Sequence, residues 1–250
     1  MYFNDVHILI YVLLGIIGIF VGTIVNTIND RLQEEKKILC KETFKEYKIK
    51  ARKNKWVLIL IPILYIALLY RFGIGNEIAN QLNLLKYLIL IPMLISVFII
   101  DYKEQIIPNR LNLTMFEIGL IFTFVFGMIN LNLAKDMLLG MVIGAGSFLI
   151  ITLLGGLIAG KEAMGFGDVK LMGALGLYFG ALNIGMIALM AFLIGAVLSI
   201  LLLVTKVKKT SDYIPFGPFI VIATFIMIFI PSSIVLDTLI TVFTLGLNKR

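Results

Sequence analysis

Long apolar runs dominate this 250-residue chain and decide what it can fold into. Most of them approach the roughly 20 helical residues that a bilayer core of about 30 Å requires. The chain is 60% hydrophobic and 15% charged, whereas soluble domains are about 45–50% apolar and about 25% charged. We therefore predict an all-α polytopic membrane helical bundle with about eight transmembrane helices. The eight runs occupy about 7–29, 56–72, 84–100, 111–129, 137–159, 169–182, 185–204 and 216–230.

A ninth apolar run, at about 233–247, is shorter and contains Asp237. It is either a short ninth crossing or a helix that lies in the membrane interface. The first run does not fit a secretory signal peptide, because no Lys or Arg precedes Arg31 and no small-residue cleavage site follows. The chain contains no low-complexity tract and no repeat of 20–50 residues, so we expect residues 1–250 to form one membrane domain.

The 22 basic residues gather on one side of the predicted topology. Seventeen fall in the loops 30–55, 101–110, 160–168 and 205–214 or at their edges, and three fall on the opposite face. The positive-inside rule places these four loops in the cytoplasm and the N-terminus outside. The net charge of +7 therefore reports membrane topology, and we expect no nucleic-acid partner. Residues 30–55 are expected to form a basic cytoplasmic loop near anionic lipid or a short interfacial helix.

Few residues are available for chemistry. A single cysteine, Cys40, excludes a disulfide within one chain and a multi-cysteine zinc site. The single histidine, His7, lies near the predicted outer face, so a Ser-His-Asp arrangement would have to be built across the membrane. If the chain carries hydrolytic machinery, carboxylates must supply it.

Two aspartates are placed for such a role. Asp101 directly follows the apolar run 84–100, and Asp168 closes the stretch AMGFGD before the next run. A carboxylate at the start of a helix is favoured by the partial positive charge there. Because ionisable groups at membrane depth are costly, a function is the default hypothesis for them.

Glycine is concentrated in the same region. Eleven of the 22 glycines lie between residues 140 and 180. We expect most of them to let helix backbones approach closely, among them Gly144, Gly156, Gly160, Gly173 and Gly176. Gly165 and Gly167 bracket Phe166 directly before Asp168. There we expect glycine to supply backbone angles that other residues avoid and to let another chain come close to the carboxylate.

Two carboxyls within hydrogen-bonding distance cannot both ionise, so they share one proton. The ionised member can take a proton from water, while the protonated member polarises a carbonyl and later protonates the leaving amine. Such a pair hydrolyses an amide without a metal or a covalent intermediate. The two spans between Asp101 and Asp168 make this pairing geometrically feasible.

At these residues the chain resembles the type IV prepilin peptidases, membrane aspartyl proteases of the GxGD class. Four stretches in family order carry the resemblance. They are GTIVNTINDRL (Gly22, Asn26, Arg31), DYKEQIIPNRL (Asp101, Pro108, Leu111), GFGDVKL (Gly165, Gly167, Asp168, Lys170) and IPFGPF (Gly217, Pro218).

The resemblance implies Asp101 and Asp168 as catalytic residues, with Gly165, Gly167, Lys170, Pro108, Gly217 and Pro218 as motif or positioning residues. It also implies eight spans in the bacterial inner membrane and a site that faces the cytoplasm. The substrates would be type IV prepilins or pseudopilins, cut after a Gly and before the apolar segment. Arg110 and Lys170 are candidates for positioning the substrate or for anchoring the membrane boundary.

Many family members also methylate the new N-terminus with S-adenosylmethionine, and many carry two Cys-x-x-Cys pairs in the first cytoplasmic loop. Here that loop offers only Cys40. We therefore expect no zinc and no cofactor for proteolysis, and methylation stays open.

Two other interpretations of the residues remain. Intramembrane acids and glycine-broken helices also suit an ion-coupled secondary transporter that uses Asp101 and Asp168. Against it, both acids lie at a membrane boundary and no inverted repeat is visible. A non-catalytic membrane scaffold would leave Asp168 and its flanking glycines without a role.

Overall fold

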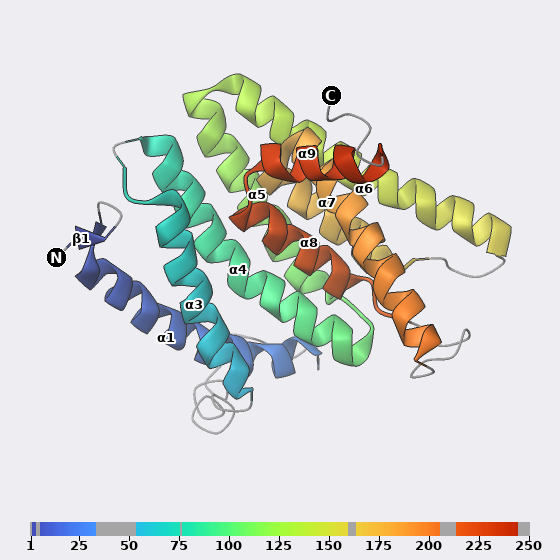
Figure 1. The fold of residues 1–250 in the computed structure, drawn as a ribbon, viewed down its shortest axis with the longest axis horizontal. Helices are drawn as coiled ribbons and strands as arrows, with labels where there is room; N and C mark the ends of the chain where they lie inside the picture. Colours follow the sequence, from blue (N-terminus) through green and yellow to red (C-terminus); the bar gives the residue numbers. More distant parts are fainter. Residues whose placement is uncertain are drawn as a thin grey trace. The chain divides into compact units, whose positions relative to one another are not determined.

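The computed structural model describes residues 2–3, 6–33, 54–75, 77–159, 164–205 and 214–244, and almost all of them are helical (Figure 1). Within these residues six helices are long and apolar enough to cross a membrane. The predicted all-α polytopic membrane bundle is therefore confirmed. The basic loop and Cys40 lie outside the described residues. The elements are β1 (Tyr2–Phe3), β2 (Val6–His7), α1 (Ile8–Gln33), α3 (Lys55–Phe72), α4 (Ile78–Glu104), α5 (Asn109–Ile129), α6 (Leu131–Ala159), α7 (Phe166–Val204), α8 (Gly217–Phe229) and α9 (Ser232–Phe243).

The chain divides into two compact units, Met1–Met115 and Phe116–Arg250. In the first unit, α1 packs antiparallel against α3, and small residues set the spacing. A Cβ added at Gly18 would lie 2.7 Å from the Cα of Pro62, and one added at Gly22 would lie 3.3 Å from the Cα of Leu58. Glycine is therefore required where the two backbones approach most closely.

Helix α4 completes the helical core of the first unit. The hydroxyl of Tyr65 on α3 donates a hydrogen bond to the carbonyl of Leu88 on α4, over 2.8 Å. Because the helices alternate in direction, the ends of α1 and α4 lie at the same end of the unit as the start of α3. We call this the Asp101 end, after the aspartate in the last turn of α4.

The second unit is built on a glycine seam between α6 and the first part of α7. A Cβ added at Gly140 would lie 2.6 Å from the carbonyl oxygen of Gly176, and Gly144 lies against the backbone of Met172 in the same way. Because both pairs fall in the same register, α6 and the first part of α7 run antiparallel to each other. The expected close-packing role is thus confirmed for Gly144 and Gly176, whereas Gly160 lies outside the described residues.

Helix α7 contains a break at Gly180, whose φ of 76° and ψ of 178° are not helical. The chain reverses there. Gly144 of α6 contacts Met172 before the break and Ile184 after it, and Phe148 one turn further along α6 lies beside Phe192. The part of α7 after Gly180 therefore runs parallel to α6, in agreement with separate runs at 169–182 and 185–204.

The last two helices are short. Helix α8 packs against the second part of α7, where a Cβ at Gly195 would lie 2.9 Å from the ring of Phe219. Helix α9 has 12 residues, which extend about 18 Å at about 1.5 Å per residue. That is well short of a bilayer core of about 30 Å. For the ninth apolar run, of which residues 245–247 lie outside the described residues, the short crossing and the interfacial helix both stay predictions.

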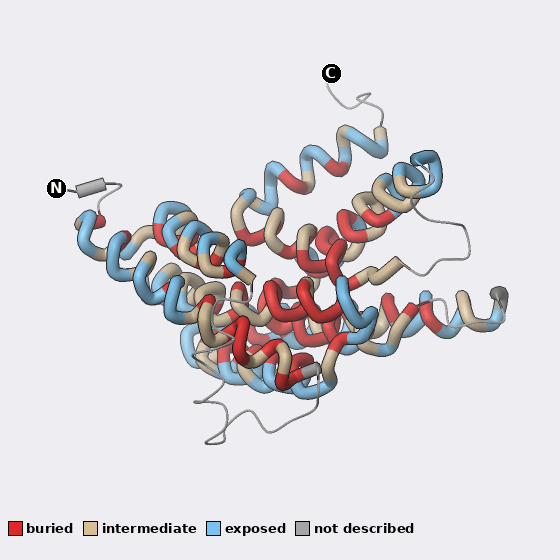
Figure 2. Tube along the Cα trace, turned by 90° about the horizontal axis from the view of Figure 1, so that it is seen from below, coloured by how far each residue is buried: buried red, intermediate tan, exposed pale blue. Residues whose placement is uncertain are grey.

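Many large apolar residues of the helices are exposed, and exposed residues recur along the helical tubes in Figure 2. On α1 the exposed fraction is 59% for both Ile16 and Phe20, and on α5 it is 71% for Phe124. Apolar faces of this kind suit contact with lipid tails, because a protein in water rarely exposes so many large apolar residues.

Candidate functional site

Asp101 lies in the last turn of α4 and is only 4% exposed. The helix ends just beyond it, because Gln105 adopts left-handed backbone angles, with φ 57° and ψ 29°. The N–H of Gln105 donates a hydrogen bond to the carbonyl of Asp101 over 2.9 Å. The aspartate is thus held by regular helical backbone at the point where the helix ends.

Pro108 begins the next helix. Its carbonyl accepts hydrogen bonds from the N–H groups of Leu111 (3.0 Å) and Asn112 (3.2 Å). Pro108 is half-buried and Arg110 is exposed. The stretch from Asp101 to Leu111 therefore forms a tight turn between α4 and α5. Asp101 is buried there, whereas Arg110 is exposed.

Asp168 is the third residue of α7 and is also 4% exposed. Its N–H donates a hydrogen bond to the carbonyl of Gly165 over 3.0 Å, which closes the first turn. The partial positive charge at the start of a helix favours the ionised carboxylate. Lys170, two residues further, is exposed. The expectation that Asp168 opens a helix is confirmed.

One expectation for the glycines before Asp168 is wrong. Gly165 has a φ of −69° and a ψ of 140°, which any residue can adopt. Among the described glycines, a positive φ occurs only at Gly73 and Gly180. Gly165 and Gly167 therefore do not supply unusual backbone angles. Gly165 instead precedes the first turn as an ordinary N-terminal cap, a position where glycine is well tolerated.

The IPFGPF stretch forms the start of α8, and Gly217 and Pro218 are both buried. The ring of Phe216 lies 6.0 Å from that of Phe148 and 5.0 Å from that of Phe192. The antiparallel register of α6 and α7 places Phe148 at the level of Asp168. In the second unit the fold thus brings the start of α8 to the same end as Asp168.

The first motif lies at the Asp101 end of the first unit. Asn26 and Arg31 of α1 are each 1% exposed, and the Asn26 amide donates to the carbonyl of Asn54 over 3.2 Å. Sequence reasoning missed Asn29, which lies about one turn beyond Asn26. The Asn29 side chain is also buried, with 2% of its surface exposed. The only signal in the sequence was a further polar side chain near the end of an apolar run. Asp101 belongs to the same end of this unit.

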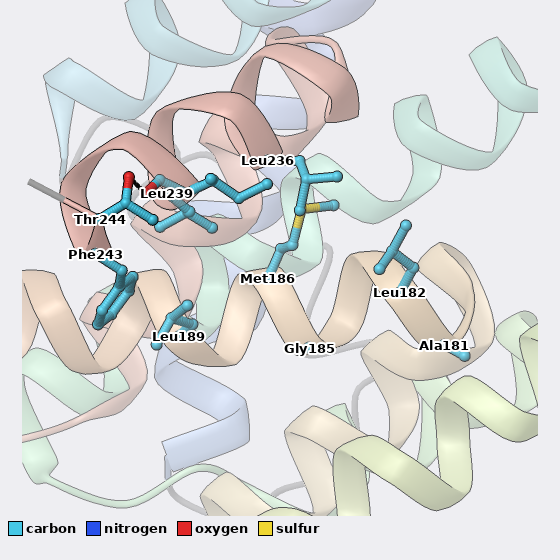
Figure 3. Close-up of a pocket in the computed structure, with 10 residues that line it drawn as sticks. Ala181, Leu182, Gly185, Met186, Leu189, Leu236, Leu239, Phe243 and Thr244 are labelled. Carbon is cyan, nitrogen blue, oxygen red and sulfur yellow. Dashed lines mark hydrogen bonds between the residues drawn. The ribbon is translucent and has the colours of Figure 1, made fainter. Parts of the chain in front are cut away.

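Two cavities are lined mainly by apolar residues. One of about 430 Å³ lies between the second part of α7 and α9, where Met186 and Leu189 face Leu236 and Phe243 (Figure 3). It contains no titratable side chain. The other, of about 250 Å³, lies in the first unit between α1, α4 and the start of α5. Within the described ranges, no group of three His, Cys, Asp or Glu residues could hold a metal ion.

The motifs agree with a comparison to known families. The sequence model described as the type IV leader peptidase family matches residues 88–200, which include both Asp101 and Asp168. The match contains two of the four stretches, DYKEQIIPNRL and GFGDVKL, and the resemblance to this family is confirmed.

Curated relatives point to the same family. The chain is similar to proteins named "Prepilin leader peptidase/N-methyltransferase". The protein of this name from Xanthomonas campestris is 34% identical over 178 residues, which are 71% of this chain and 58% of the relative. The one from Aeromonas hydrophila is 31% identical over 164 residues, which are 65% of this chain and 55% of the relative. A protein of the same name in Pseudomonas aeruginosa is 35% identical over 133 residues, 53% of this chain and 45% of the relative. The chain thus spans about half the length of these relatives. No solved structure matches it significantly.

Proposed function

We propose that this chain, as a member of the type IV leader peptidase family, is a membrane-embedded aspartyl endopeptidase. One observation carries the proposal. Asp101 and Asp168 are both 4% exposed, each lies at the end of an apolar helix, and both fall within the stretch 88–200 that matches the family. A buried carboxyl at membrane depth is costly unless it has a function.

In this mechanism Asp101 and Asp168 form a dyad that shares one proton. The ionised carboxylate takes a proton from a water molecule, whose oxygen attacks the scissile carbonyl carbon. The protonated carboxyl donates a hydrogen bond to the carbonyl oxygen. When the C–N bond breaks, a proton passes to the leaving amine, and the dyad again holds one proton. No covalent intermediate is formed.

The substrates of the proposed peptidase are type IV prepilins or pseudopilins, cut after a Gly and before their apolar segment. The family and the names of the relatives support this class. The apolar helix of such a substrate can lie in the bilayer beside the exposed apolar faces of the chain, while its polar leader reaches the dyad.

We propose the bacterial inner membrane as the location, with the dyad facing the cytoplasm. The distribution of basic residues supports this orientation. The two compact units are proposed to act as one peptidase domain, since the family match runs from residue 88 to residue 200 across the boundary at Met115. The transporter alternative has no support, because the matching family model is described as type IV leader peptidase and the relatives given above carry the name of a prepilin leader peptidase.

Methylation is the second activity in the names of the relatives. S-adenosylmethionine carries an ammonium group and a ribose diol, which are commonly bound by carboxylates. The two cavities described above have no carboxylate in their walls. Neither cavity therefore offers the groups that would hold the cofactor.

The proposal is tested by co-expressing the chain with a prepilin and measuring the mass of the pilin N-terminus. The wild-type chain should remove the leader, and Asp101→Asn and Asp168→Asn should each abolish removal. Asp237→Asn on α9 is the matched control, because Asp237 is exposed and lies outside the family match. Leader removal by either dyad variant would refute the mechanism, and a mass increase of one methyl group would establish methylation.

A further inference from the structure

The mechanism above does not use the cavity of the first unit. This cavity has a volume of about 250 Å³ and is walled by α1, α4 and the first turns of α5. Along α1 it extends from Val21 to Leu32, which are 11 residues apart and therefore span about 16.5 Å of helix rise. That length is close to half of a bilayer core of about 30 Å. The cavity thus reaches from the Asp101 end about one leaflet deep into the apolar layer.

The wall of this cavity offers few polar groups. The hydroxyl of Ser96 donates a hydrogen bond to the carbonyl of Pro92 over 3.0 Å, and the hydroxyl of Thr114 donates to the carbonyl of Arg110 over 2.8 Å. Both hydroxyl hydrogens are therefore used within their own helices. The other lining residues, apart from Arg110, are aliphatic side chains, a proline and a methionine. Such a wall favours an apolar occupant, because an unpaired polar group buried against it is costly.

Arg110 supplies positive charge at the mouth of the cavity. It lines the cavity and is exposed, so a ligand can reach its guanidinium from outside. A guanidinium has five N–H donors in a planar fork and can bind a phosphate through two of them. Lys55 and Lys103 are also exposed at the Asp101 end. In the described part of this end, the exposed Glu104 and the half-buried Asp30 offset the charge only in part.

Two aromatic side chains indicate the depth of this end in the membrane. Trp56 at the start of α3 is 44% exposed, and Tyr102 near the end of α4 is 69% exposed. Exposed Trp and Tyr are enriched at the level of the lipid headgroups. Arg110 lies at the same end of the unit, so its guanidinium lies where lipid phosphates are found.

We propose that this cavity binds an anionic phospholipid, with the phosphate on Arg110 and one acyl chain running inward along α1. The proposal goes beyond the peptidase function and does not depend on it. An acyl chain has no polar groups to satisfy, and the depth of the cavity matches one leaflet. Basic pockets between transmembrane helices on the cytoplasmic side are typical sites for anionic headgroups.

A peptide segment fits the cavity less well. An α-helix is about 10 Å across with its side chains, so 16.5 Å of helix would occupy roughly 1,300 Å³. This is about five times the volume of the cavity. An extended peptide would leave N–H and C=O groups unpaired against the apolar wall.

The first test is native mass spectrometry of the full-length chain in detergent, titrated with dioleoyl-phosphatidylglycerol. Arg110→Gln should raise the Kd about tenfold, because the phosphate loses charge-assisted hydrogen bonds. Lys103→Gln is the matched control. Lys103 is exposed at the same end but does not line the cavity, so its replacement should leave the Kd unchanged. Dioleoyl-phosphatidylcholine, which has no net charge, should bind the wild-type chain more weakly.

The second test leaves Arg110 intact and blocks the cavity. Thr114 and Leu113 are adjacent and exposed on α5, but only Thr114 lines the cavity. Thr114→Phe should therefore raise the Kd for phosphatidylglycerol about tenfold, whereas Leu113→Phe should not change it. Glycerol phosphate, which carries no acyl chain, should not displace the bound lipid.

Four results would overturn the proposal. Equal binding of the two lipids, or an unchanged Kd in Arg110→Gln, would show that the charge of Arg110 does not select the lipid. Equal effects of Thr114→Phe and Leu113→Phe would place the lipid elsewhere. Displacement by glycerol phosphate would show that only the headgroup is bound. Displacement by a synthetic prepilin peptide, measured in an Asp168→Asn background, would assign the cavity to the substrate instead.

Discussion

The carboxylate of Asp136, near the start of α6, accepts a hydrogen bond from the backbone N–H of Ala181 over 3.2 Å. Ala181 is the first residue after the break in α7, where the N–H groups of a new helical segment lack partners within the helix. Asp136 therefore caps the second part of α7 from a neighbouring helix. The same carboxylate lies against the Cα of Gly180, so the cap and the reversal depend on each other.

Replacing Asp136 tests the cap. Asp136→Ala removes the acceptor and should lower the free energy of unfolding by about 1 kcal/mol, as for other lost N-caps. Amide hydrogen exchange at the start of the second segment of α7 should become faster. Asp136→Asn keeps the acceptor and should restore most of the protection, so equal exchange in Asn and Ala variants would show that the carboxylate does not cap the segment.

Gly180→Ala should be the more damaging change at the reversal. The new Cβ would need a φ of 76° and would collide with the Asp136 carboxylate. Strain of this kind costs of order 1–3 kcal/mol, visible as a lower unfolding temperature in detergent. Gly185→Ala is the matched control on the same helix, because nothing lies within 4 Å of its added Cβ. Similar unfolding temperatures for the two variants would contradict the described turn.

The glycine seam of the second unit gives a further prediction. In Gly176→Ala the new methyl group would collide with the backbone of Gly140 and push α6 and α7 apart. The yield of monodisperse protein in size-exclusion chromatography should fall sharply. Gly146→Ala on α6 meets nothing within 4 Å and should behave as wild type. The seam would be disproved by a well-folded Gly176→Ala protein.

The first unit offers a matched pair on one face of α1. Gly18→Ala places a Cβ 2.7 Å from the Cα of Pro62, whereas Gly15→Ala places one 3.6 Å from the Cδ1 of Ile66, an ordinary contact. Overpacking costs typically 1–3 kcal/mol. Thermal unfolding should therefore shift downward for Gly18→Ala alone, and equal shifts in both variants would show that the contact between α1 and α3 is looser.

Much of the helical pattern follows from the sequence, because apolar length is a local property. The run 7–29 became α1 (Ile8–Gln33) and the run 56–72 became α3 (Lys55–Phe72). The position of Asp168 at the start of a helix was predicted for the same reason. The reversal at Gly180 depends on Asp136, 44 residues earlier, and such a pairing leaves no trace in hydropathy.

The candidate site was predicted less completely. Asp101 and Asp168 could be named because acids are rare beside apolar runs, and their mutual pairing remains a prediction. The conformation of Gly165 was predicted wrongly, since a helix start needs only an ordinary extended residue before it. The burial of Asn29 could not be recognised in advance, because it is visible only when the packing around it is known.

The reversal at Gly180 leaves the segment that begins with Phe166 only 14 residues long before the turn, or about 21 Å at about 1.5 Å per residue. A lipid core of about 30 Å exceeds that length, and a short hydrophobic segment is accommodated by thinning the bilayer around it. Hydrolysis consumes water, which a full-thickness membrane excludes. The hydrophobic mismatch created by one glycine would thus bring the aqueous phase closer to Asp168, the buried acid proposed to activate water.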